Sequence, residues 1–148
     1  MADLFKGIYE PTITIFLEAG EAMEAMSVVV LGTGSDEGKV FLARGSNGAG
    51  RPYGFVAQKV TQDGVAQYGV GGLITRTAAV GDKVGVYVGG GILKTDRLAA
   101  GSSIVGGDVL YAGASGTVTD VQGSETVPVG IAETSPDSDG VIRFKSLL

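Results

Sequence analysis

The chain has 148 residues, 44% of them apolar and 18% charged, a composition typical of a globular protein that buries a core of its own. It contains no Cys, His or Trp, which excludes disulfides, thiol and imidazole catalysis and the soft metal ligands. The formal net charge is −5 without a cluster of Lys or Arg, and no apolar run approaches the roughly 20 residues of a membrane span, so neither nucleic acid nor a membrane is expected as a partner.

The N-terminal segment, residues 1–11, mixes charged and apolar side chains and lacks the uninterrupted apolar stretch of a signal peptide, so we expect synthesis in the cytoplasm. It is too short and irregular to form a core. Its apolar side chains therefore either fold back on the domain or become buried in a neighbouring molecule. We treat residues 1–11 as an extended arm and residues 12–148 as one β domain. The candidate partner contacts in the arm are Leu4, Phe5, Ile8, Tyr9 and Pro11.

Three later segments carry the pattern of strands with one buried face. Residues 12–17, 83–88 and 126–131 alternate apolar with other side chains and are rich in β-branched residues. Pro128 places the last of these at a sheet edge or at the start of a strand. Helix signals are weak because the 26 glycines recur every few residues. The sequence therefore predicts an all-β fold, a single compact domain built as a β-barrel or a β-sandwich.

The stretch VVVLGTGSDEGKV, residues 28–40, ends in Gly-Lys and invites comparison with a phosphate-binding loop. A P-loop requires Gly where Thr33 stands and Ser or Thr where Val40 stands, and a dinucleotide fingerprint requires Gly where Glu37 stands. Residues 109–118 have the same order of strand, Gly-rich turn and strand without a lysine. We therefore predict a hairpin here and assign no cofactor-binding residue.

No metal or catalytic site emerges from the remaining polar residues. Asp137 and Asp139 lie in a loop that resembles a calcium segment only superficially, because the spacing and the closing Glu of such a loop are missing. A solvated turn is the simpler interpretation. Without His and Cys, catalysis would have to rely on carboxylates, Lys or Tyr, and nothing in the sequence fixes the separation of a carboxylate pair, so we expect no enzyme activity.

An internal similarity relates residues 52–68 to residues 128–144. Both segments contain Pro-x-Gly before an apolar strand, a turn with Asp-Gly, and a return strand with an aromatic residue, Tyr68 or Phe144. In the second copy, Ile142 and Phe144 are predicted to face the core and Arg143 to face outward. We expect two related β units, about 19–72 and 80–148, packed into one barrel or sandwich.

One loop offers a further candidate contact. Residues 48–52 contain no large apolar side chain that could pack, and Arg51 is the single charged residue among them. Its guanidinium could bind the carboxylate of a partner. A mobile connector without a binding role is an equally good interpretation of this loop.

Two sets of sequence segments in the chain resemble those of a known protein family. "AGE…GKVFLA…RPYGFVAQ" and "GGDVLYAGASGTVTDV…VPVGIAE…DGVIRFK", over residues 20–145, are similar in texture to the capsid decoration proteins of tailed bacteriophages, also called cement or head-stabilising proteins. The resemblance implies a β-barrel-like or β-tulip-like module on the outer capsid surface. Such proteins are commonly trimers and bind the major capsid protein where its subunits meet, often with an N-terminal arm. The arm here has one Pro, whereas a well-known short member has a Pro-rich segment.

The function that this resemblance implies is structural. We expect a virion protein made in the host cytoplasm that binds the outer surface of a phage capsid and stabilises the shell by bridging major capsid protein subunits. Its partners would be the major capsid protein and further copies of itself in a homotrimer, with no cofactor. The negative net charge suits an outer surface better than a DNA-facing one. The alternatives are a tail or head-completion protein, and a glycan-binding β module, which the absence of Trp disfavours.

Overall fold

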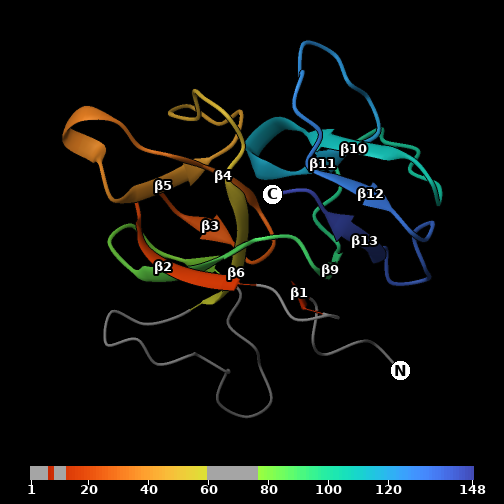
Figure 1. The fold of residues 1–148 in the computed structure, drawn as a ribbon, viewed down its shortest axis with the longest axis horizontal. Coiled ribbons are helices and arrows are strands. Elements are labelled where there is room, and N and C mark those ends of the chain that lie inside the picture. Colours follow the sequence, from red (N-terminus) through yellow and green to blue (C-terminus); the bar gives the residue numbers. More distant parts are fainter. Residues whose placement is uncertain (1–6, 9–12, 60–76) are drawn as a thin grey trace.

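The structure is a computed structural model that describes residues 7–8, 13–59 and 77–148 (Figure 1). Across these ranges the regular elements are strands and two short 3-10 turns, which confirms the all-β class. None of the helical segments described is long and apolar enough to cross a membrane. In chain order the elements are β1 (Gly7–Ile8), β2 (Ile13–Ala19), β3 (Met23–Glu24), β4 (Val28–Leu31), η1 (Gly34–Asp36), β5 (Lys39–Leu42), β6 (Gly54–Lys59), β7 (Thr77–Ala78), β8 (Lys83–Val88), β9 (Ile92–Thr95), β10 (Val109–Ala112), η3 (Ala114–Gly116), β11 (Val118–Thr119), β12 (Gly130–Ala132) and β13 (Ile142–Ser146).

Five strands close into a barrel on the left of Figure 1, in the order β2, β5, β4, β6, β8 and back to β2. β2 and β8 are an antiparallel pair and confirm two of the predicted strands. A short parallel contact, in which Glu18 is opposite Lys39, joins β2 to β5 and closes the barrel. The two-stranded pair β3–β7 adds further side chains to the interior. The interior is filled by a cluster of buried residues: Ala19, Met23, Val29, Val40, Val56, Ala78, Val84 and Val86.

The remaining strands form a six-stranded sheet on the right of Figure 1, in the order β1-β9-β13-β12-β10-β11. All of its strand pairs are antiparallel. β12 and β13 are joined by the turn predicted at Asp139-Gly140. Ile142 and Phe144 are fully buried and Arg143 is partly exposed, so the predicted orientation of this strand is confirmed.

The two sheets are related by their connectivity. Strands β2, β8, β6, β4 and β5 are neighbours in the same order as β9, β13, β12, β10 and β11. In each set the hairpin around a 3-10 turn, β4–η1–β5 or β10–η3–β11, confirms the predicted hairpin pair. A parallel bridge between Leu98 and Val118 corresponds to the closing contact of the barrel.

The expected division into units of about residues 19–72 and 80–148 stays a prediction, and the strand pairing shows where β8 lies. β8 pairs with β2 and β6 in the barrel, and the second sheet takes its first long strand from β9 onward. By neighbour order, β8 is therefore the counterpart of β13. The segment around Tyr68, which the sequence similarity matched to β13, lies outside the described residues.

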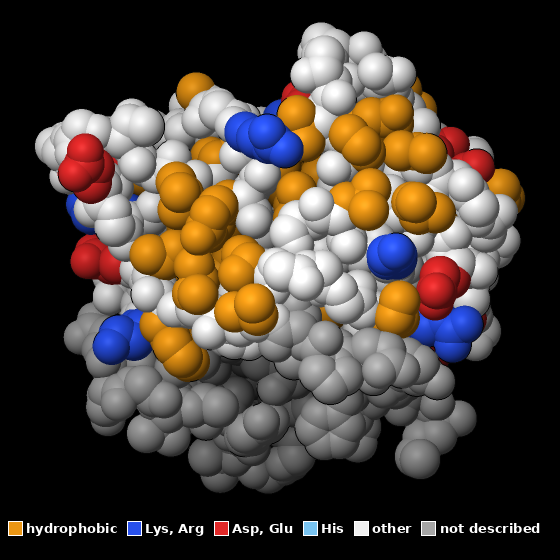
Figure 2. All heavy atoms as spheres, in the orientation of Figure 1, with side chains coloured by type: hydrophobic (Ala, Val, Ile, Leu, Met, Phe, Trp, Pro, Cys, Tyr) orange, Lys and Arg blue, Asp and Glu red, His pale blue; other side chains and the backbone are white. Residues whose placement is uncertain are grey.

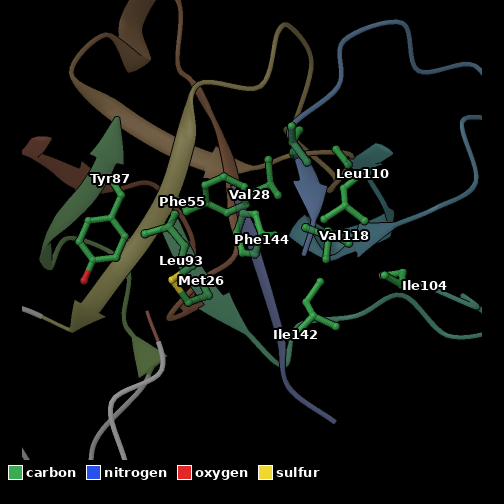
Figure 3. Packing of buried hydrophobic residues seen from close by; sticks show 14 of the residues in the cluster. Met26, Val28, Phe55, Tyr87, Leu93, Ile104, Leu110, Val118, Ile142 and Phe144 are labelled. Carbon is green, nitrogen blue, oxygen red and sulfur yellow. The ribbon is translucent and has the colours of Figure 1, made fainter. Parts of the chain in front are cut away.

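The barrel and the sheet share one hydrophobic core. On β4, Val29 points into the barrel, whereas Val28 and Val30 belong to a second cluster that extends into the six-stranded sheet. Phe55 from β6 and Phe144 from β13 meet in this cluster with ring centroids 5.0 Å apart (Figure 3). The members from the second sheet include Leu93, Leu110, Val118 and Ile142, and Val129 directly before β12 joins them. Residues 28–30 of β4 and residues 55–57 of β6 are thus buried on both faces.

Polar contacts reinforce this junction. The N–H of Gly116 in η3 donates to the Ala43 carbonyl at 2.8 Å, which attaches the turn of the second unit to the end of β5. The Arg44 side chain donates to the Ala112 carbonyl at 3.2 Å and lies 3.3 Å from a carboxylate oxygen of Glu125. The two units are therefore joined by packing, main-chain hydrogen bonds and an ion pair.

Candidate interaction surfaces

The Gly-Lys sequence at residues 38–39 does not form an anion site. Lys39 begins β5, and its Nζ lies 3.3 Å from the Asp36 carboxylate in the adjacent η1 turn. Gly34 and Gly38 have φ of +62° and +85°, the left-handed conformation that lets the chain reverse. The lysine is paired within its own hairpin, and a strand rather than an α-helix follows it.

The acidic loop before β13 is organised as a turn. One Asp137 carboxylate oxygen accepts the N–H of Asp139 at 2.9 Å and the N–H of Val141 at 3.0 Å. The Asp137 carboxylate therefore accepts hydrogen bonds from backbone N–H groups of its own turn, which stabilises the turn. In the part of the chain that the structure describes, no three His, Cys, Asp or Glu side chains come together as a metal site would require.

Most of the predicted arm contacts lie outside the described residues. This holds for Leu4, Phe5, Tyr9 and Pro11, whose part in a partner contact stays a prediction. Ile8 belongs to β1, which pairs with β9 and places Ile8 opposite Leu93. At this point the arm follows the edge of the six-stranded sheet.

Arg51 lies at the rim of a groove between the two units. The groove has a volume of about 550 Å³ and is formed by the end of β4, the loop before β6 and the C-terminal residues. Arg51 is exposed and makes no ion pair with any described carboxylate. Two large apolar side chains are exposed beside it, Leu31 by 42% and Leu147 by 44%. We call this feature the Arg51 groove; its lining is Leu31, Thr33, residues 49–53, Leu147 and Leu148.

Sequence reasoning identified Arg51 but missed the groove. Leu147 reaches this place because β13 runs beside β12, and the Leu147 N–H donates to the Val129 carbonyl at 3.0 Å. The apolar wall therefore comes from a part of the chain far from the loop. The sequence signal at this place is local: Leu31 follows a run of valines. Such a signal does not reveal that the pairing of β12 with β13 brings Leu147 to the same groove.

A second candidate surface is the outer face of the six-stranded sheet. The strand register places Val109, Ile131, Lys145 and Ile92 side by side in one row across β10, β12, β13 and β9. Val109 and Ile131 are exposed large apolar residues. Figure 2 shows exposed hydrophobic side chains in two separate areas of one face, one over the barrel and one over β10 and β12.

The fold is an all-β one in which a closed barrel and a curled sheet share a core, and it is found in a solved phage structure. The chain is similar to the head fiber gp8.5 N base in bacteriophage phi29, with a TM-score of 0.53 and 20% sequence identity, covering 92% of this chain and 94% of that one. No protein-family model and no curated protein matches the chain. At this identity the likeness establishes the common fold over nearly the full length of both chains.

Proposed function

We propose that the protein is a structural component of a phage virion that binds the outer surface of the capsid and stabilises the shell by bridging major capsid protein subunits. The observation that carries the proposal is the fold shared with a head fiber base over 92% of the chain. The resemblance of residues 20–145 to capsid decoration proteins supports the same conclusion from the sequence.

The structure suits a mechanical role. Because the barrel and the sheet share one core, a load applied to one unit is transmitted to the other through buried side chains. A copy bound across two capsid subunits would add contacts that must break before the shell can expand or rupture. Individual contacts can be weak, since many copies on a symmetric lattice act together.

The decisive experiment mixes the purified protein with capsids that lack it. We expect saturable binding at micromolar concentration and a higher temperature of capsid disruption once the sites are filled. Cryo-electron microscopy of the loaded particles would show whether the copies lie where major capsid protein subunits meet and whether they form trimers. Absence of binding, or density confined to the tail or the portal, would overturn the proposal.

Deleting residues 1–11 tests the contribution of the arm. We expect weaker capsid binding, because the deletion removes the apolar residues proposed to be buried on assembly. The fold should persist, since the main-chain bonds lost from the described residues are those of the two-residue strand β1. Circular dichroism and the melting temperature would verify folding, and unchanged affinity would show that the arm is not a contact.

A further inference from the structure

The end of β4 has an open hydrogen-bonding edge that faces the Arg51 groove. Even-numbered residues of this strand bond to β5: Val28 accepts the Ala43 N–H and Gly32 donates to the Lys39 carbonyl, each at 2.9 Å. Odd-numbered residues bond toward β6, and the Val29 carbonyl accepts the Tyr53 N–H at 2.8 Å. Since alternate residues of a strand point the same way, the N–H and C=O of Leu31 face residues 51–53.

The chain itself does not complete this edge. The Tyr53 N–H, one residue before the Gly54 that is opposite Val29, bonds to the Val29 carbonyl, so the next donor that could face the Leu31 carbonyl is the Arg51 N–H. Pro52, between these two residues, has no N–H to donate. Among the described residues, no hydrogen bond joins the Leu31 backbone to this segment. One peptide unit of a strand edge is therefore available beside the groove.

The side chains around this edge define what could pair with it. Leu31 and Leu147 offer apolar surface, and half-buried Tyr53 and Leu148 add to it, so an apolar side chain would be favoured between them. The Arg51 guanidinium at the rim has no carboxylate partner among the described residues. An unpaired guanidinium in this position favours a carboxylate, which it can bind through two parallel hydrogen bonds.

Charge also sets the direction in which a segment would lie. Thr33, also in the groove lining, precedes η1, where Asp36 is paired with Lys39. Glu37 directly after η1 is exposed and has no cation partner among the ion pairs described. A carboxylate there would meet a like charge, whereas at Arg51 it meets an opposite one. The acidic residue of a bound segment therefore belongs at the Arg51 end.

We propose that the Arg51 groove binds an extended segment of the capsid surface that carries an apolar side chain next to an Asp or Glu. The segment adds to the free end of β4 through the N–H and C=O of Leu31, buries its apolar side chain between Leu31 and Leu147, and places its carboxylate on Arg51. This inference rests on the proposed function, because it names the chemistry of the capsid partner at one site.

The test measures binding of four variants to capsids that lack the protein. Arg51→Gln removes the guanidinium charge, and Leu147→Ser removes one apolar wall. We expect each to weaken binding about tenfold, the effect of losing one charge-assisted hydrogen bond or one buried apolar contact. Arg51→Lys keeps the charge but not the bidentate geometry and should show an intermediate loss. Melting temperatures should match that of the wild type, since Arg51 and Leu147 are exposed.

The matched control is Lys83→Gln. Lys83 is likewise exposed and without an ion pair among the described residues, but it lies on β8 of the barrel, away from the groove lining and from the outer face of the six-stranded sheet. We expect its binding to equal that of the wild type. If the wild type binds and Arg51→Gln binds equally well, or if Arg51→Gln and Lys83→Gln weaken binding alike, the groove inference is overturned while the proposed function stands. If the wild type itself does not bind, both are overturned.

Discussion

At the residue scale, Gly116 decides how closely the two units approach. It is buried with φ of +75°, and a Cβ built there would lie 2.9 Å from both the Val28 carbonyl oxygen and Leu42 Cδ2. Gly116→Ala should therefore lose about 1–2 kcal/mol from the left-handed backbone and a further ~1–3 kcal/mol from overpacking. Urea unfolding measures the loss.

Gly34→Ala is the matched control for this substitution. Gly34 has φ of +62° in the corresponding turn of the first unit, and a Cβ there would meet nothing within 4 Å. It should lose only the backbone contribution, about 1–2 kcal/mol. Equal losses of unfolding free energy for the two variants would mean that the junction accommodates a methyl group at Gly116 without overpacking.

For a single residue, the sequence reveals the chemical character of its side chain more readily than the residues that surround it in the fold. Arg51 could be singled out because no other charge lies in its glycine-rich loop. Its groove could not, because Leu31 and Leu147 meet only through the pairing of β12 with β13 and the packing of the two units. A contact between segments so far apart in the chain depends on the tertiary fold, which local patterns do not specify.

At the scale of elements, the valine run in β4 explains where pattern reasoning succeeds and fails. It predicted a strand and its hairpin, because β-branched residues and the following glycines are local signals. It could not predict that both faces are buried, since a continuous apolar run has no period. The strand predicted over residues 126–131 is shorter, starting at Gly130. Pro128 has no N–H for a ladder, which agrees with the start of a strand near it.

The ring contact between β6 and β13 makes these strands energetically dependent on each other. Phe55 and Phe144 are fully buried with centroids 5.0 Å apart. Phe55→Leu and Phe144→Leu should each lose about 1–2 kcal/mol of stability. The double variant should deviate from additivity by about 0.5–1.5 kcal/mol, because the first substitution already removes the ring contact.

A second pair calibrates this double-mutant cycle. Val84 belongs to the cluster inside the barrel, and Phe144 belongs to the cluster between the barrel and the six-stranded sheet. The losses of stability from Val84→Ala and Phe144→Leu should therefore be additive to within about 0.5 kcal/mol. Additivity for the Phe55 and Phe144 pair as well would show that the two strands are held by general burial and not by their rings.

At the scale of the whole molecule, the repeated strand order describes two units that cannot separate. Parting them would expose at least six large side chains at about 1.5–3 kcal/mol each, or ~9–18 kcal/mol together. A domain of this size has a total stability of about 5–15 kcal/mol. Opening the junction would therefore unfold the protein. The six are Val28, Val30, Phe55, Leu93, Leu110 and Phe144.

Native-state hydrogen exchange tests this coupling directly. The best-protected amides of β4 and β6 and those of β10 and β13 should open with the same free energy, equal to that of global unfolding in urea. The reason is that each set buries its side chains against the other, so neither can lose its packing alone. A distinctly lower opening free energy for β9–β13 would show a second unit that unfolds by itself. A protein with that property could not transmit a load from one unit to the other, so the measurement also tests the mechanical role that we propose.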